Sequence, residues 1–401
     1  MNKKISVGIA VAFIFIAITI TFTATMIYAM DLFDRKIINV QERAAMYEKI
    51  SEIDSVIRQN YYLPIDDKRV MTGLSQGYLL GLGDEYTRYM TSAEISAMRA
   101  SNSGEIVGVG LSVEQNASGY AVVSSVVPDS SADKIGMAIG DIIIKANDED
   151  ALVLGYEAVE KLLVGPEGNQ LKLTYTRSGT ENEAEMVYDA FETTSVVYGT
   201  VDTIFAYVRF TDFNELTYGQ FNTAMDELMQ DALVRAFIFD VRGLHSGTDL
   251  SIVASILDRL MGQGVIISGI YSGEISKVLY TSNAEQLQYP AIVLVDEQTK
   301  GLSEIFAAVM GEKENVRIIG AQTAGKGTYQ ELVTLSDGTG LYITVCKLMA
   351  CGYLDIDRTG VTPDFIALSA EGFVLTDGVP DKKADVQLSR GLEVMQTELL
   401  S

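Results

Sequence analysis

A lysine enclosed by glycines is the first feature of this sequence that could do chemistry. Residues 321–330 read A-Q-T-A-G-K-G-T-Y-Q, so Lys326 lies between Gly325 and Gly327, with Gln330 four residues further on. A lysine amine acts as a general base only when it is neutral, and neutrality requires a buried site that lowers its pKa from about 10.4. Flanking glycines let the backbone fold closely enough for the side chain to point inward. The segment is therefore compatible with a general base, although G-K-G alone would favour a solvated lysine beside a turn.

Other reactive side chains are few. His245 is the only histidine, so a Ser-His-Asp triad could use only this residue, and a histidine on a surface loop is the simpler interpretation. The only cysteines are Cys346 and Cys351, without the second Cys or His pair of a zinc site, and we expect neither a metal nor another cofactor. The two thiols could pair across a tight turn or lie as small buried groups in a strand pair.

Composition limits the partners. The 401 residues suffice for two or three domains, each with its own core. The net charge of -24 repels phosphate backbones, which argues against nucleic acid as a ligand. Self-association as a homo-oligomer is compatible with the sequence.

The N-terminal segment is apolar. Residues 5–30 carry no charged side chain and exceed the roughly 20 residues that a helix needs to cross a membrane. We expect a single-pass anchor in the cell membrane, with residues 1–4 held in the cytoplasm by Lys3 and Lys4 and the bulk of the chain extracytoplasmic. A secretory signal peptide is the alternative, but its apolar region is usually about 7–15 residues and ends in a small-x-small site.

A helical spacer should follow over residues 31–104. Apolar residues recur at helical intervals over 39–62, and Pro64 ends that pattern. A second helix is expected over 66–80, with G-L-G-D-E-Y-T-R-Y at residues 81–89 as the turn that ends it. The polar residues 101–104 would link this spacer to the next domain.

The segment over residues 105–180 alternates short strands with short helices. It resembles a PDZ domain in three motifs, G-V-G-L-S-V at 108–113, A-D-K-I-G-M-A-I-G-D at 132–141 and L-L-V-G-P-E-G at 162–168. Such domains add a peptide as a strand and hold its terminal carboxylate on backbone amides. The resemblance assigns that role to Val109, Gly110 and Leu111, and implies protein or peptide C-termini as partners.

The rest of the chain reads as an α/β domain. After a connecting segment over 181–192, apolar strands alternate with helices over 193–385, as in a sheet covered on both faces, and a C-terminal helix is expected over 386–401. The helices of this domain are expected over 216–230, 250–261 and 303–310. Sites in such folds lie where strands end and helices begin.

Over essentially its whole length the chain resembles the C-terminal processing peptidases, or tail-specific serine proteases. The motifs stand in the family's order, among them F-I-F-D-V-R-G at 237–243, the lysine segment and G-V-T-P-D-F at 360–365. The resemblance implies a serine nucleophile with Lys326 as its general base and Gln330 as the residue that orients the base. The fold class would be a transmembrane helix, a helical spacer, a PDZ domain and an α/β peptidase domain.

The match fails at the expected nucleophile. The family typically reads N-E-G-S-A-S-A-S-E, and aligning Ser303 and the glutamate after it places Gly301 at the catalytic serine. Ser303 and Thr299 are the nearest hydroxyls that could substitute, although Ser303 is also well placed as the N-cap of the following helix. We therefore expect a pseudopeptidase, and the alternative is an active endopeptidase that uses Ser303 or Thr299 with Lys326.

The expected oxyanion hole also departs from the family. Residues 240–247 read D-V-R-G-L-H-S-G where the family usually has D-L-R-G-N-P-G-G. Backbone amides of Gly247, Leu302 and Ser246 would face the carbonyl oxygen, because the donors are main-chain groups. Ser246 puts that geometry in doubt, since glycine would adopt a positive φ at lower cost.

Overall fold

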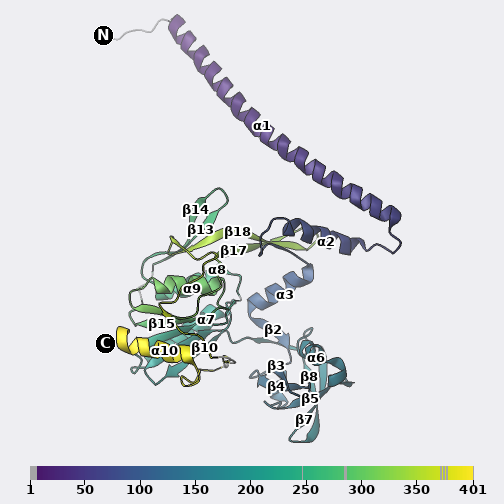
Figure 1. The fold of residues 1–401 in the computed structure, drawn as a ribbon, viewed down its shortest axis with the longest axis vertical. Coiled ribbons are helices and arrows are strands. Elements are labelled where there is room, and N and C mark those ends of the chain that lie inside the picture. Colours follow the sequence, from purple (N-terminus) through teal and green to yellow (C-terminus); the bar gives the residue numbers. More distant parts are fainter. Residues whose placement is uncertain are drawn as a thin grey trace. The chain divides into compact units, whose positions relative to one another are not determined.

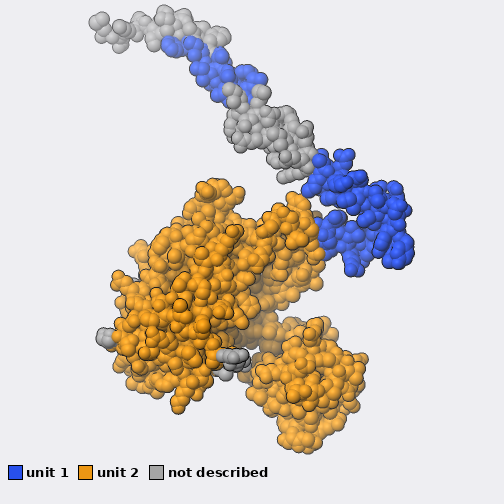
Figure 2. Space-filling view, viewed as in Figure 1, with its two compact units in different colours: residues 1–75 blue, residues 76–401 orange. Residues whose placement is uncertain are grey.

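The computed structural model describes residues 7–245, 247–283, 287–370, 373, 375 and 378–400. Within the first helix it describes side chains at Phe13, at residues 16–26 and from Ala44 onward. The chain divides into two compact units, residues 1–75 and 76–401 (Figure 2). The division falls inside the predicted helical spacer.

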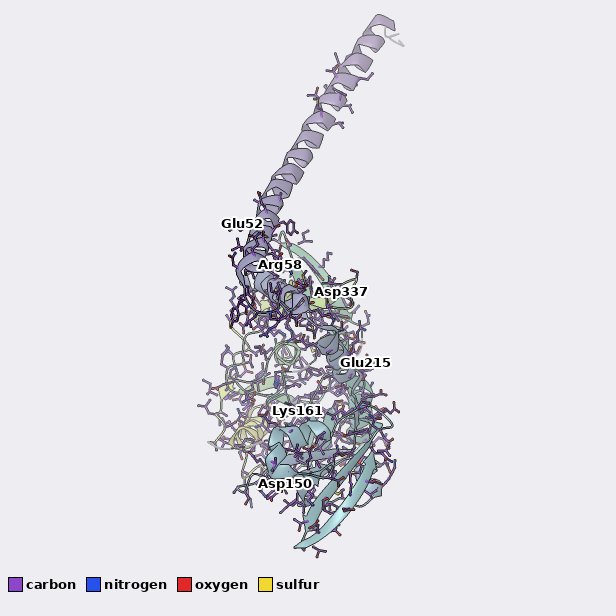
Figure 3. All side chains as sticks on the ribbon, turned by 90° about the vertical axis from the view of Figure 1, so that its right-hand side faces the viewer. Glu52, Arg58, Asp150, Lys161, Glu215 and Asp337 are labelled. Atoms are coloured by element: carbon purple, nitrogen blue, oxygen red, sulfur yellow. The ribbon has the colours of Figure 1, made fainter. Side chains whose placement is uncertain are left out.

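The first unit is helical. It consists of α1 (Val7–Asn60), which carries Arg58 near its end (Figure 3), and most of α2 (Asp67–Leu80). The side chain of Arg58 pairs with Asp54 on α1 at 2.9 Å and joins α1 to α2 through Asp67 at 2.5 Å. The helix predicted over 39–62 is the end of α1 rather than a separate element. Among the described residues, no helix combines the length and the apolarity needed to cross a membrane. The predicted anchor over 5–30 lies partly, and the predicted N-terminus over 1–4 wholly, outside the described residues and side chains.

A six-stranded sheet builds the domain that resembles a PDZ domain. Its order is β3 (Leu111–Gln115), β4 (Ala121–Val126), β5 (Ile142–Ala146), β7 (Gln170–Arg177) and β8 (Thr180–Val187), with β6 (Glu149–Asp150) paired to β5. The strand β3 therefore lies at an edge of the sheet. The helices are α4 (Ser131–Lys134), α5 (Ala151–Leu154) and α6 (Tyr156–Leu162), and β2 (Glu105–Gly108) pairs separately with β9 (Asp189–Glu192). The predicted connecting segment over 181–192 thus forms strands.

A mixed sheet lies at the centre of the α/β domain (Figure 1). Its order is β10 (Val196–Val201), β11 (Phe205–Phe210), β12 (Ala236–Asp240), β15 (Ala291–Val295), β16 (Val316–Gly320) and β20 (Phe365–Ile366). Only the β10–β11 pair is antiparallel. The strands β12 and β15 are buried at every position, because helices cover both faces.

The helices divide between the two faces of this sheet. One hydrophobic core includes side chains of α7 (Thr217–Gln230), α8 (Leu250–Leu260) and α9 (Leu302–Gly311), and a second core on the other face includes α10 (Val386–Val394). The helices α7, α8 and α9 agree with the predicted ranges to within one residue at each end. The predicted C-terminal helix is α10 followed by a π-helix, η1 (Met395–Leu399), and Ser401 lies outside the described residues.

A second sheet packs on the α8–α9 layer. It joins β1 (Arg88–Met90), β18 (Gly340–Ala350), β13 (Gly264–Tyr271) and β14 (Ile275–Ser282), and β18 also pairs with β17 (Thr328–Thr334) and β19 (Leu354–Asp355). The strand β1 comes from the segment predicted as a turn within the spacer, and α3 (Ser92–Ser103) follows it. Residues 88–90 thus belong to the sheet that carries β17, because Arg88 pairs with Tyr342 on β18.

Lys313, after the C-terminus of α9, should make stability depend on pH. Its buried amine donates to the carbonyl oxygens of Leu260 at 2.7 Å and Leu287 at 3.0 Å, and burial lowers its pKa to about 8. The unfolded chain then binds more protons between pH 8 and 10.5, so stability should rise with pH across that window by up to ~3 kcal/mol. Urea unfolding at several pH values, compared with Lys313→Met, measures this slope. Equal slopes in both proteins would contradict the prediction.

Candidate functional site

A sharp turn between β15 and α9 forms the centre of the candidate site. Gly301 is the N-cap of α9 and adopts φ 76° and ψ −118°, a conformation that side-chain-bearing residues rarely adopt. The predicted N-cap, Ser303, is wrong, because Ser303 lies inside the first turn of the helix. Gly301 is buried, so a side chain at this position would point into the protein rather than into solvent.

Lys326 faces Gly301. A Cβ atom built on Gly301 would lie 3.6 Å from Cδ and 4.0 Å from Nζ of Lys326, which is ordinary van der Waals contact. The structure therefore brings together two residues that the sequence separates by 25 positions. Burial lowers the pKa of Lys326, and the positive charges of Lys300 and Arg88 lower it further, whereas Glu304 opposes the shift.

Tyr86 covers this pair of lysines. Its ring centroid is 5.1 Å from Nζ of Lys326 and also 5.1 Å from Nζ of Lys300, distances typical of cation–π contacts. Tyr86 comes from the segment just before β1, which was predicted as a turn from the sequence. The strand β1 thus has a role in the site, because its pairing with β18 holds Tyr86 over Lys326.

Glu304, which was not among the predicted site residues, connects the turn at Gly301 to the lysine segment. Its carboxylate is fully buried and accepts hydrogen bonds from the backbone N–H of Gly301 at 2.9 Å, Gly325 at 2.7 Å and Lys326 at 2.8 Å. The hydroxyl of Thr323 donates a fourth bond at 2.5 Å. One side chain on the first turn of α9 therefore sets the position of both segments. The only feature of the sequence that could have indicated this role is the position of Glu304 three residues after the N-cap, where a glutamate often caps a helix.

The two substitute hydroxyls are engaged elsewhere. Ser303 is fully buried, and its hydroxyl lies 2.6 Å from the carbonyl oxygen of Leu244 and accepts a bond from the N–H of Lys300. Thr299 is also fully buried, and its hydroxyl is 3.0 Å from the carbonyl oxygen of Val241. Through these hydrogen bonds both hydroxyls stabilise the turn between β15 and α9.

A small cavity connects the predicted site residues. Its volume is about 10 Å³, room for about one water molecule. The residues that line it are His245, Gly247, Thr248, Lys300, Gly301, Leu302, Lys326, Thr328, Tyr329, Gln330 and Tyr342. The structure therefore gathers Lys326, Gln330, His245 and the two oxyanion candidates Gly247 and Leu302 around one small cavity.

The oxyanion candidates differ in how they are held. Gly247 adopts φ 93°, and a Cβ there would lie 2.7 Å from Cβ of Phe213, so this position requires glycine. Leu302 is the first residue of α9, where backbone N–H groups have no partner within the helix. Ser246 lies outside the described residues. His245 is exposed, and its Nδ1 lies 2.9 Å from the carbonyl oxygen of Gly243.

Gln330 lies on β17 beside the cavity. Its amide nitrogen donates to the hydroxyls of Thr328 at 2.9 Å and Thr344 at 3.1 Å. These bonds hold the amide group in the wall of the cavity that Lys326 also lines, and the role of Gln330 in orienting Lys326 stays a prediction. Cys346 and Cys351 are both free thiols, so the disulfide across a turn is not formed.

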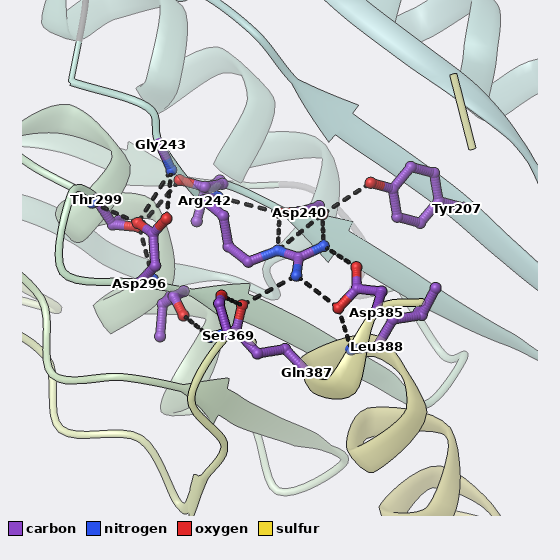
Figure 4. A network of polar contacts seen from close by, with 12 residues as sticks. Tyr207, Asp240, Arg242, Gly243, Asp296, Thr299, Ser369, Asp385, Gln387 and Leu388 are labelled. Atoms are coloured by element: carbon purple, nitrogen blue, oxygen red, sulfur yellow. Dashed lines mark hydrogen bonds and ion pairs between the residues drawn. The ribbon is translucent and has the colours of Figure 1, made fainter. Parts of the chain in front are cut away.

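A buried ionic network lies behind the turn that carries Gly243 (Figure 4). The guanidinium of Arg242 forms ion pairs with Asp240 at 2.6 Å and with Asp385 at 2.7 Å. Tyr207 donates to Asp240 at 2.7 Å, and Gln387 accepts from Arg242 at 3.0 Å. Burial would raise the pKa of Asp240, but the charge and hydrogen bonds of Arg242 outweigh it and lower that pKa. Asp240 therefore stays ionised beside Arg242, and the network joins the end of β12 to the N-terminus of α10.

The predicted carboxylate loop lies before β3, and one of its amides is already bonded. The N–H of Val109 donates to the carbonyl oxygen of Leu163 at 2.9 Å. Gly110 adopts φ 83°, and a Cβ there would lie 2.1 Å from Cβ of Ser130. Two of the three predicted amides, those of Gly110 and Leu111, are therefore the candidates to hold a carboxylate.

Comparisons with known proteins identify both domains. The model of peptidase family S41 matches residues 204–367, and the PDZ domain model matches residues 122–177. The carboxy-terminal processing protease CtpA of Bacillus subtilis is 27% identical over 319 residues, which cover 79% of this chain and 68% of that protein. The carboxy-terminal-processing protease of Bartonella bacilliformis is 27% identical over 338 residues, 82% of this chain and 76% of that protein.

A solved structure supports the fold. The crystal structure of a protein assigned to the S41 proteases from Bacteroides fragilis has a TM-score of 0.52 at 17% identity, covering 86% of this chain and 96% of that one. Residues 204–367 therefore carry a peptidase family S41 domain and residues 122–177 a PDZ domain, and the chain as a whole is similar to carboxy-terminal processing proteases.

Proposed function

We propose that this protein binds the C-terminal tails of proteins or peptides and does not cleave them, because glycine occupies the position of the nucleophile. The observation that carries the proposal is the position of Lys326 beside Gly301. The Cβ atom of a serine at position 301 would lie 4.0 Å from the amine of Lys326. In the α/β-hydrolases, a different class of enzymes, the catalytic serine also lies on a sharp, strained turn between a strand and a helix. Glycine offers no oxygen there, so no acyl-enzyme can form.

The contribution of a serine nucleophile to the rate is large, which supports loss of activity in a chain that lacks it. Removing the serine of a comparable hydrolase costs on the order of 10⁶ in kcat, which corresponds to roughly 8 kcal/mol of barrier. The alternative is an active endopeptidase that uses Ser303 or Thr299. It is disfavoured because both hydroxyls are fully buried and bonded to carbonyl oxygens, so either would have to leave its bond and turn toward Lys326.

Peptide hydrolysis by the purified chain tests this function. We expect no cleavage of an unstructured peptide with an apolar C-terminus, either by the unmodified chain or by Lys326→Ala, when products are followed by mass spectrometry. Cleavage by the unmodified chain that Lys326→Ala abolishes would overturn the proposal and favour the endopeptidase.

Tail binding should depend on the terminal carboxylate. The strand β3 lies at the edge of its sheet, where a peptide can be added as a strand, and Gly110 and Leu111 precede or begin it. We expect a peptide with a free C-terminus to bind more tightly than its amidated form, measured by fluorescence anisotropy. Equal binding of both forms would remove the claim of tail recognition.

We also propose that residues 5–30 anchor the protein in the cell membrane, with the two domains outside the cytoplasm. The charge-free composition of this segment after Lys3 and Lys4 supports the proposal. Deletion of residues 1–30 should move the protein from the membrane fraction to the soluble fraction. Retention of the shortened chain in a carbonate-washed membrane fraction would contradict the anchor.

A further inference from the structure

Two positive charges lie beside the position where glycine replaces the nucleophile. The Nζ atoms of Lys300 and Lys326 are both 5.1 Å from the ring centroid of Tyr86. In the family pattern that aligns Gly301 with the catalytic serine, residue 300 aligns with alanine, so Lys300 adds a charge that this pattern lacks. The chain thus has an additional ammonium group directly before the position that lacks a hydroxyl.

These charges lack a counter-charge in the part of the chain that the structure describes. Neither lysine amine forms an ion pair or a hydrogen bond there. Burial lowers the pKa of Lys326, and the charges of Lys300 and Arg88 lower it further, so the positive charges repel one another. Glu304 opposes that shift, but its carboxylate already accepts bonds from three backbone N–H groups and from Thr323. In a chain of net charge -24, cations left unpaired at one point favour an anionic ligand.

The cavity beside Gly301 has room for one ligand atom next to these charges. Its volume of about 10 Å³ suits about one water molecule or one carboxylate oxygen. Its lining residues include Lys300, Gly301, Leu302 and Lys326. Leu302 begins α9, whose first backbone N–H groups have no partner within the helix and carry a partial positive charge. Both lysines are partly exposed, so an ion from solvent can reach them.

A carboxylate fits this arrangement better than a neutral peptide bond. Each ammonium group has three N–H donors and no acceptor, and hydrogen bonds to an ionised group are about twice as strong as neutral ones. No side chain of residue 301 competes for the space, which a Cβ atom 4.0 Å from Nζ of Lys326 would begin to fill. Since the surrounding domain matches a peptidase family, the fitting carboxylate is the C-terminus of a peptide chain.

We propose that Lys300, Lys326 and the N-terminus of α9 bind the terminal carboxylate of a peptide, with one oxygen in the cavity beside Gly301. The peptidase-type domain then holds a chain that already ends at this point, which is the product of a cleavage made by another enzyme. This inference rests on the proposed loss of cleavage, and it adds a second carboxylate site to the one proposed for the PDZ domain.

Protection of the lysines from chemical modification tests this site separately from the PDZ domain. Reductive methylation of the full chain with formaldehyde and a borane, followed by mass spectrometry of proteolytic fragments, measures each lysine by itself. A peptide with a free C-terminus, at about ten times its Kd, should slow the labelling of Lys300 and Lys326 about tenfold, whereas its amidated form should not. Lys277 is the internal control, because its amine also faces a tyrosine ring, that of Tyr271 at 4.7 Å, outside the site.

Lys300→Met tests whether the additional charge carries the binding. This variant keeps most of the side-chain length but removes the ammonium group, so about tenfold more peptide should be needed to protect Lys326. Lys300→Arg keeps a positive charge and should preserve the protection of Lys326. Lys277→Met is the matched control and should change nothing. Full protection of Lys326 in Lys300→Met at the original peptide concentration would overturn the role of Lys300.

The outcomes separate this inference from the proposed function. Equal protection by the free and amidated peptides, or protection by neither, would overturn the carboxylate site and leave tail binding by the PDZ domain intact. Sodium acetate that protects as strongly as the peptide at the same concentration would overturn a peptide as the ligand and favour a small organic acid. Cleavage of the peptide, visible in the same mass spectra, would instead contradict the proposed function.

Discussion

Gly301→Ser is expected to gain peptide cleavage that depends on Lys326. The new hydroxyl would start from a Cβ atom 3.6 Å from Cδ and 4.0 Å from Nζ of Lys326, close enough for the amine to take its proton. The serine oxygen would then attack the peptide carbonyl, and the leaving amine would receive the proton from Lys326. Glu304 already holds the backbone at Gly301 and at Lys326 in place through hydrogen bonds. The substitution therefore requires no rearrangement of the turn.

The expected gain is large but below that of an intact nucleophile. A serine nucleophile contributes on the order of 10⁶ in kcat. A side chain at φ 76° costs about 1–3 kcal/mol of strain, which corresponds to roughly 5- to 150-fold in rate if the strain is relieved in other states. We therefore expect a gain on the order of 10⁴ over the unmodified chain.

The pH dependence of the gained activity reports on the base. Burial and the charges of Lys300 and Arg88 lower the pKa of Lys326 from 10.5. Because only the neutral amine accepts a proton, the rate should rise with pH and level off below pH 10.5.

Two variants control this experiment. Gly301→Ala carries the same backbone strain without the hydroxyl and should stay inactive, and Gly301→Ser with Lys326→Ala should stay inactive as well. Labelling by a fluorophosphonate gives a covalent readout that does not require a good substrate. A folded Gly301→Ser protein that neither cleaves peptide nor reacts with the probe would contradict the assignment of this position.

Arg242→Met should destabilise the α/β domain by about 3–5 kcal/mol. The side chain of Arg242 is 1% exposed and pairs with two aspartates that are equally buried. Methionine preserves much of the volume but leaves the carboxylates of Asp240 and Asp385 without a counter-charge, and removing one partner of a buried ion pair costs this much. Since Asp385 is also the N-cap of α10, that helix should loosen from the sheet first.

Urea unfolding followed by circular dichroism measures this loss. Arg259→Met is the matched control, because Arg259 pairs with a largely exposed Asp226 at 2.5 Å and should cost less than about 1 kcal/mol. Similar unfolding midpoints for the two variants would contradict a structural role of the buried network.

Local sequence determined most of the secondary structure of the two domains. The buried strands β12 and β15 were predictable because a sheet covered on both faces selects continuous apolar runs. The helices α7, α8 and α9 were predictable from their periodicity, and the lysine segment from its glycines. The connecting segment over 181–192 was predicted without strands, because its charged residues alternate with small ones and carry no strong apolar pattern.

The sequence also determined which segments belong to the candidate site. The order of the motifs along the chain was enough to predict that the turn at Gly301 and the segment at Lys326 lie together. Only the tertiary structure decided how they meet. The contacts of Glu304 with Lys326, of Tyr86 with both lysines and of Tyr156 with Val113 join different segments, and local periodicity carries no information about such contacts. The direction of a side chain at a turn depends on backbone angles set by distant partners. For that reason the predicted N-cap at Ser303 was wrong, and its hydroxyl instead holds the backbone of Leu244.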